Sequence, residues 1–144
     1  MAVTIEEYHR ATQHLGDAFD FESNDIRLAL LSNAYTPDFD AHDAWDDVSA
    51  NEITGTGYTA DGEALTSKTA TFDAASDWTT YAAADVVWAT ATFTARYAAL
   101  YNNSPAADAD KKLLVLVDFG QDESPAAENF TIAWSADGVF RIRA

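Results

Sequence analysis

The sequence predicts a mainly β protein, an antiparallel β-sandwich of jelly-roll-like type with one N-terminal α-helix. Three observations predict this fold class. Apolar and polar residues alternate in several short runs, turn-forming segments separate these runs, and one stretch near the N-terminus has apolar residues at helical spacing. The 144 residues suit a single domain. We divide it into an N-terminal helix or arm over residues 1–24 and a β-sandwich over residues 25–144.

The helix is expected over residues 4–15. Thr4 and Glu7 have the spacing of a capping box, in which each side chain bonds the backbone amide of the other residue. Apolar and small side chains follow at helical intervals, and Gly16 suits the end of a helix.

Strands are expected in the rest of the chain. In the segment DIRLALLS, Ile26, Leu28 and Leu30 lie on one side of the pleat. Further strands are predicted at residues 69–72, 86–90, 92–100, 113–119, 129–134 and 139–143. The turn sequence ADG at residues 136–138 predicts a hairpin between the last two. The acidic segment TPDFDAHDAWDDVSANE is expected to form a long surface loop with a short helical turn.

The charge of the chain limits its classes of partner. Twenty-four acidic side chains and eight basic ones give a net charge of −16 at pH 7. Nucleic-acid binding needs a cationic patch, so we expect no nucleic-acid partner. No apolar run approaches the roughly 20 residues that span a bilayer, so we expect a soluble protein with no membrane partner. Abundant aspartate with little lysine favours adaptation to high salt, which screens repulsion within such a surface.

The glycine-rich stretch SANEITGTGYTADGEAL resembles a phosphate loop only in part. Gly57 and Gly62 have the glycine spacing of such a loop, but Glu63 and Ala64 stand where lysine and a hydroxyl are needed. Glycine here instead indicates a turn with positive φ or a close approach of another backbone. We therefore interpret this stretch as a shaped loop without a catalytic group.

Other chemistry has weak support in the sequence. Asp38, Asp40 and Asp43 could hold a structural cation through their oxygens, although the EF-hand pattern is not met, and a solvated acidic loop is the favoured interpretation. No cysteine is present and the three histidines are scattered. We expect no enzyme activity and no cofactor.

The four tryptophans divide into two groups. Trp88 and Trp134 fall in expected strands and are predicted to lie in the core. Trp45 and Trp78 fall in expected loops, where exposed aromatic rings serve protein interfaces or sugar platforms.

Several segments, in order, resemble a family of small structural proteins of tailed phages and their prophages. These segments are SNAYTP, ANEITGTGYTADG, ARYAALY, VDFG and FTIAW, and the match runs from about Asp25 to the C-terminus. The resemblance implies a virion structural protein without catalytic activity, for which head decoration and tail roles are both proposed. The greater acidity of this chain suggests a virus of a halophilic host.

The leading expectation is a capsid-surface decoration protein that is made in the host cytoplasm and binds the major capsid protein as a homo-oligomer, with a trimer favoured. A turret, tail or baseplate component is the near alternative, and a carbohydrate-binding module acting on host glycans is a more distant one. The residues expected at an interface are Tyr35, Trp45, Asn51, Glu52, Gly55, Gly57, Tyr58 and Trp78.

Overall fold

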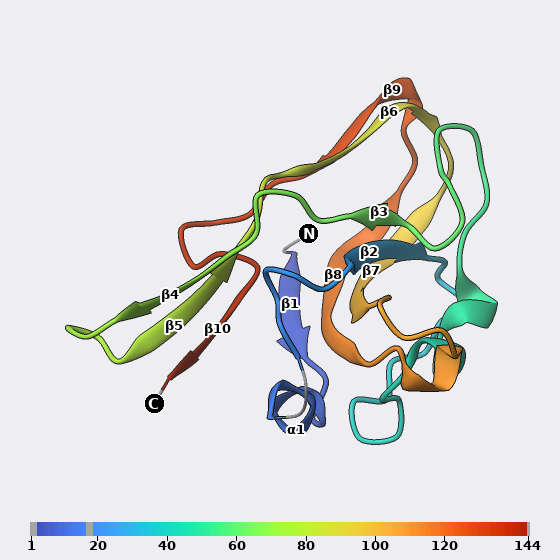
Figure 1. Cartoon of the computed structure of the whole chain (residues 1–144). Coiled ribbons are helices and arrows are strands. Elements are labelled where there is room, and N and C mark those ends of the chain that lie inside the picture. The colour runs from blue at the N-terminus through green and yellow to red at the C-terminus, as the bar shows by residue number, and fades with distance from the viewer. Residues whose placement is uncertain (1–2, 17–18, 144) are drawn as a thin grey trace.

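Residues 3–16 and 19–143, which the computed structural model describes, form ten strands and one short α-helix (Figure 1). The strands are β1 Thr4–Glu7, β2 Ile26–Leu31, β3 Glu63–Ala64, β4 Thr69–Asp73, β5 Trp78–Ala82, β6 Val86–Thr92, β7 Ala95–Asn102, β8 Leu113–Glu123, β9 Ala126–Ile132 and β10 Phe140–Arg143. The helix α1 is Ala11–Leu15, and the 3₁₀ turns are Trp45–Asp47, Ser49–Asn51 and Asp108–Asp110. The prediction of a mainly β, antiparallel chain with one N-terminal α-helix is confirmed, and the helix is short.

Every strand pair is antiparallel. Five strands form the largest sheet in the order β1-β8-β7-β2-β3, and β10-β5-β4 and β6-β9 form the other two. The largest sheet and the β6–β9 ribbon pack together as two layers of a sandwich. This division into five, three and two strands is less regular than the two equal sheets of a jelly roll.

The central strands are buried on both faces. Ile26, Leu28 and Leu30 of β2 point into the larger core together with residues of β6, as the alternation predicted. The intervening Ala29 and Leu31 point into a second core on the other face. This second core is closed by side chains of the acidic loop, so that loop covers a sheet face as well as facing solvent.

The expected helix over residues 4–15 is wrong in its first half. Thr4–Glu7 is strand β1, which pairs with β8 along the edge of the largest sheet, so the capping box does not form. The helical part is limited to Ala11–Leu15. Tyr8 and Ala11 are buried in the cores, so residues 4–15 are built into the body of the protein and do not extend from it as an arm. Pairing with a long neighbouring strand has overridden a local helical pattern.

The predicted hairpin at the C-terminus is also wrong. Gly138 has a φ of +73° and its amide bonds the Ser135 carbonyl at 3.0 Å, so a tight turn does form at the ADG sequence. The strands on its two sides then separate, because β9 pairs with β6 and β10 pairs with β5. The predicted strand over residues 92–100 is likewise divided, since β6 ends at Thr92 and β7 begins at Ala95.

The β10-β5-β4 sheet projects from the body, to the lower left in Figure 1. Its base is anchored by aromatic contacts, since Phe21 meets Tyr81 and Phe140 edge-on at 5.4 and 5.8 Å between ring centroids. Strand β4, which is farthest from this anchor in the sheet order, is exposed at every residue. We call these three strands the projecting sheet.

Candidate interaction surface

The glycine-rich segment, residues 51–64, follows the edge of β2. The Ile53 amide donates to the Leu30 carbonyl at 3.0 Å, and the Ser32 amide donates to the Asn51 carbonyl at 2.9 Å. Glu63–Ala64 then pairs with the start of β2 as β3. The segment thus closes this edge of the largest sheet, and Asn51 contributes to that closure through its backbone.

Tyr58 fills the break between these two pairings. Its hydroxyl accepts a hydrogen bond from the Leu30 amide at 3.0 Å and donates one to the Glu52 carboxylate at 2.6 Å. The same Glu52 oxygen accepts from the Asp61 amide at 2.7 Å. Burial raises the pKa of the Glu52 carboxyl above its ordinary value. A side chain therefore supplies the acceptor that a paired strand would have given to Leu30.

The glycines of this segment lie against the protein's own backbone. A Cβ added at Gly55 would stand 2.7 Å from the Thr92 carbonyl oxygen, and one at Gly57 would stand 2.8 Å from that of Ala89. Gly57 also has a φ of +80°, and Gly62 has a φ of +76°. The close approach expected at Gly55 and Gly57 is thus present, and the approaching backbone is that of strand β6 in the same chain.

Two of the aromatic residues expected at an interface are buried. Trp45 is 2% exposed and stacks on Tyr101 at 4.4 Å between ring centroids, so its placement on an exposed loop is wrong. Tyr35 is also 2% exposed, and its hydroxyl lies 2.9 Å from both the Tyr8 hydroxyl and His42 Nδ1. Both residues close the second core.

Trp78 begins strand β5 and does not lie in a loop. Its ring is partly buried, with the Arg141 guanidinium 4.3 Å and the Arg143 guanidinium 5.9 Å from the ring centroid. These cation–π contacts tie β5 to β10 at the outer end of the projecting sheet. Of the other two tryptophans, Trp88 lies in the core as predicted, whereas Trp134 lies beyond β9 and is partly buried.

The three aspartates considered for a cation have separate contacts. Asp38 accepts from the Ala41 amide at 2.9 Å within its own turn. Asp40 lies 2.6 Å from His9 Nδ1, and this hydrogen bond raises the pKa of His9. Asp43 lies 3.2 Å from Lys112 Nζ. Within residues 3–16 and 19–143, no group of three or more acidic or histidine side chains is arranged to hold a metal ion.

Exposed apolar side chains mark surfaces that the sequence did not indicate. Val3 beside β1 is 60% exposed, Phe72 of β4 is 57% exposed, Val87 of β6 is 47% exposed and Ile5 of β1 is 46% exposed. Val3, Ile5 and Phe72 lie on or beside strands at the edges of their sheets, where an unpaired edge is open to contact by another protein.

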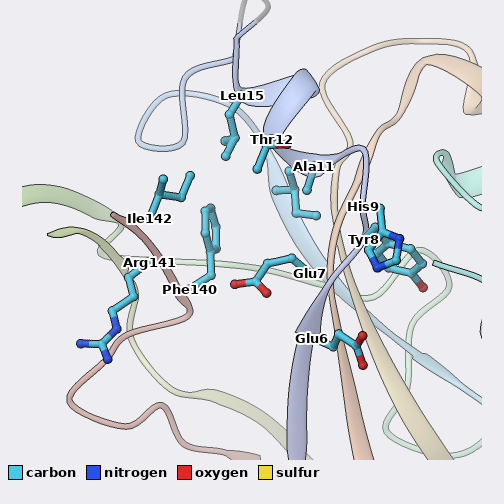
Figure 2. A pocket seen from close by; sticks show the side chains of 11 residues that line it. Glu6, Glu7, Tyr8, His9, Ala11, Thr12, Leu15, Phe140, Arg141 and Ile142 are labelled. Carbon is cyan, nitrogen blue, oxygen red and sulfur yellow. The ribbon is translucent and has the colours of Figure 1, made fainter. Parts of the chain in front are cut away.

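A groove separates β1 and α1 from strand β10 (Figure 2). Its volume is about 540 Å³, and a smaller hollow of about 230 Å³ continues it along β1 toward the turn before β10. Glu7, Phe140 and Arg141 line both parts. The sequence did not indicate this groove for two reasons. Residues 4–7 fit a helix and not strand β1, and the last strand was expected to pair with residues 129–134 and not with β5.

Comparisons with protein-family models, with curated proteins and with solved structures found no match for this chain. None of the helices in the part of the chain that the structure describes combines the length and the apolar character needed to cross a bilayer.

Proposed function

We propose that this chain is a structural subunit of a tailed-virus particle, and that it decorates the outer surface of the capsid by binding the major capsid protein. The sequence resemblance suggests the class of protein. The structural observation that carries the proposal is the exposed strand β4, the outermost strand of a sheet that projects from the body, which presents Phe72 to solvent. No strand pairs with its outer edge in the described residues, although the Ala70 amide donates to the Glu22 carboxylate at 3.0 Å. Such an edge offers backbone and apolar contacts to a neighbouring protein.

The two tryptophans considered for sugar binding are engaged within the chain. Trp45 is stacked in the second core, and Trp78 lies beneath two guanidinium groups. A flat ring free to stack on a sugar is the feature that a carbohydrate-binding site needs; Trp45 is buried, and the partly buried ring of Trp78 already contacts two guanidinium groups. The observations therefore favour protein contacts over glycan contacts.

In the proposed arrangement the chain forms a homo-oligomer, which we propose to be a trimer, on the exterior of a particle from a halophilic host. The net charge of −16 makes repulsion between neighbouring copies strong in dilute buffer. Molar salt screens this repulsion and strengthens apolar contacts, so assembly experiments belong in concentrated salt.

The test is to locate the chain in purified particles. Virus grown on its natural host is nuclease-treated, purified in high salt and probed with an antibody against this chain, by blotting and by immunogold electron microscopy. The expected result is label distributed over the capsid. Label confined to the tail would instead indicate a tail or baseplate component, and purified particles without the chain would overturn the proposal.

A pair of variants then tests the projecting sheet. Phe72→Lys and Thr71→Lys add the same charge to neighbouring exposed positions of β4, whose side chains point to opposite faces. Both variants are expected to fold. In rebinding to particles that lack the chain, we expect Phe72→Lys to fail and Thr71→Lys to attach. Equal attachment of both would show that the Phe72 face makes no contact.

A further inference from the structure

Strands β1 and β10 are the unpaired edges of two different sheets, and they lie on opposite sides of one groove. β1 is the first strand in the order of the largest sheet, and β10 is the first in the order of the projecting sheet. Residues of both strands line the groove, and Figure 2 shows Glu7 of β1 directed toward Phe140 of β10, with Glu6 directed to the other side of β1. Each wall therefore carries backbone groups that could pair with an added strand.

The pairing of β1 shows which of its backbone groups face the groove. The Tyr8 amide donates to the Leu114 carbonyl at 3.0 Å, continuing the ladder in which Glu7 lies opposite Val115. Because bonded and non-bonded pairs alternate in antiparallel strands, the amides and carbonyls of Ile5 and Glu7 point away from β8. These groups form the free edge of β1.

The groove also offers room for side chains. The lining at its α1 end is apolar, and Figure 2 shows Leu15 and Ala11 facing Phe140 and Ile142 across the space. A volume of about 540 Å³ lies within the range of roughly 300–1,000 Å³ that is usual for binding pockets. Alternate side chains of an added strand would enter this pocket, while its backbone paired with the two edges.

The directions of the two strands suit a single inserted strand. In Figure 1 the arrows of β1 and β10 both point downward. A segment running the opposite way would be antiparallel to both, as are all neighbouring strands in the two sheets. It would join the largest sheet and the projecting sheet into one continuous sheet.

The charge of the groove indicates the chemistry of its occupant. Glu6 and Glu7 are exposed on β1 and form no ion pair with any residue of ranges 3–16 and 19–143. The facing Arg141 is already engaged, with its guanidinium 2.8 Å from the Asp137 carboxylate and 4.3 Å from the Trp78 ring centroid. His9, which also lines the groove, is bonded to Asp40 at 2.6 Å, so the free charge at the groove is acidic, on a chain of net charge −16. Basic groups would be attracted, and a second copy of this chain would be repelled.

We propose that the groove between β1 and β10 accepts an extended segment of another protein, flanked by lysine or arginine and with apolar side chains at alternate positions. The segment pairs as a strand with both edges. This inference deepens the proposed function and rests on it for the source of the segment, which is an arm of a neighbouring virion protein.

The test uses a synthetic strand as the probe. A peptide of alternating valine and threonine with two lysines at each end is titrated into the isolated full-length chain, up to roughly millimolar concentration, and followed by fluorescence anisotropy and amide NMR. We expect saturable binding with shifts at β1 and β10. N-methylation of alternate backbone amides removes strand pairing, and glutamate in place of lysine reverses the charge. Each change is expected to weaken binding about tenfold or more.

A matched pair of variants locates the binding. Thr12 is exposed on α1 and lines the groove, whereas Gln13 is exposed on the same helix and does not line it. Thr12→Trp is expected to fill the groove and abolish peptide binding, and Gln13→Trp is expected to bind as the wild type does. Equal binding by both variants, or no binding of the lysine-flanked peptide to the wild type, would overturn the proposal.

Two further results separate this inference from its alternatives. A concentration-dependent dimer of the wild type that Thr12→Trp dissociates would assign the groove to a second copy of the chain and overturn the basic-segment proposal. The peptide experiment uses no virus, so the absence of this chain from purified particles would contradict the proposed function and leave the result for the groove standing.

Discussion

Two regions of this protein differ in how closely they pack on its body. The glycine-rich segment of residues 51–64 lies against β2 and β6, and its backbone and side chains bond the body at several points. The hairpin of β4 and β5 extends into solvent, and β4 is exposed throughout. The comparison teaches that the glycines of residues 51–64 mark places where one backbone packs on another, whereas the threonine-containing strand β4 is an open surface.

Between these two regions, the largest expected effect is that of Gly62→Ala. Gly62 has a φ of +76°, and an added Cβ would stand 2.6 Å from the Cα of Ala29, close against the Leu28 carbonyl as well. Strain and overpacking together should lower the free energy of unfolding by about 3 kcal/mol or more. Urea unfolding of the two proteins measures the difference.

Gly16→Ala is the matched control, because Gly16 has a helical φ of −80°. Its free energy of unfolding should change by less than about 1 kcal/mol. A Gly62→Ala protein as stable as this control would show that the segment is not clamped onto β2.

Tyr58→Phe tests the hydroxyl that substitutes for a strand partner. The change leaves the buried Leu30 amide without its acceptor and removes a donor from Glu52. We expect a loss of about 1–3 kcal/mol in the free energy of unfolding, measured by denaturant titration. Tyr97→Phe is the control, since the Tyr97 hydroxyl makes no hydrogen bond among the described residues. An equally large loss of stability in Tyr97→Phe would show that the bonds of the Tyr58 hydroxyl are not the cause.

Glu52→Gln should have a smaller effect that depends on pH. Burial raises the pKa of the Glu52 carboxyl, so its stabilising contribution is complete below the ordinary value of 4.5 and is lost as pH rises through the higher folded-state pKa. Glutamine retains an oxygen that accepts from Tyr58 and Asp61 but does not ionise.

The stability of Glu52→Gln relative to the wild type should therefore increase from about pH 4 to pH 7. Melting temperatures across this range provide the measurement. Glu128→Gln, which removes the charge of an exposed acid on β9, is the control. A parallel response of the two variants would show that burial of Glu52 has no influence on stability.

The smallest effect is expected in the hairpin. Phe72→Thr should change the free energy of unfolding by no more than about 0.5 kcal/mol, because the Phe72 ring is 57% exposed. The same substitution at Phe140, which is 6% exposed, should cost about 3–5 kcal/mol. Thermal unfolding of both variants compares the exposed strand β4 with the anchored base of the projecting sheet. A large loss of stability in Phe72→Thr would contradict the description of β4 as an exposed surface.

Elements with strong local patterns could be predicted from the sequence. The alternation at Ile26, Leu28 and Leu30 gave β2, and the apolar run at residues 113–119 gave most of β8. β5 was missed although Trp78, Thr79, Thr80 and Tyr81 are all strand-favouring residues, a signal that was available.

Features that depend on distant pairing could not be predicted in this way. Thr4–Glu7 satisfies a helix cap locally, and it becomes a strand because β8 offers a free edge beside it. The groove depends on two such pairings, of β1 with β8 and of β10 with β5. Likewise, nothing near Tyr58 in the sequence indicates that its hydroxyl bonds Leu30. Register between segments far apart in the chain decides all three features.

The β6–β9 ribbon has a mechanical consequence. Both strands run from the body to the projecting sheet, with Thr92 opposite Ala126 at one end and Val86 opposite Ile132 at the other. The part of a pull on the projecting sheet that reaches the ribbon is therefore carried along both of its backbones at once, in the same direction. Such tension does not separate the two strands and does not slide one past the other. It therefore places little load on the hydrogen bonds between them. Within the ribbon, the first contacts to yield would be those that hold its inner side chains, such as Trp88, against the body.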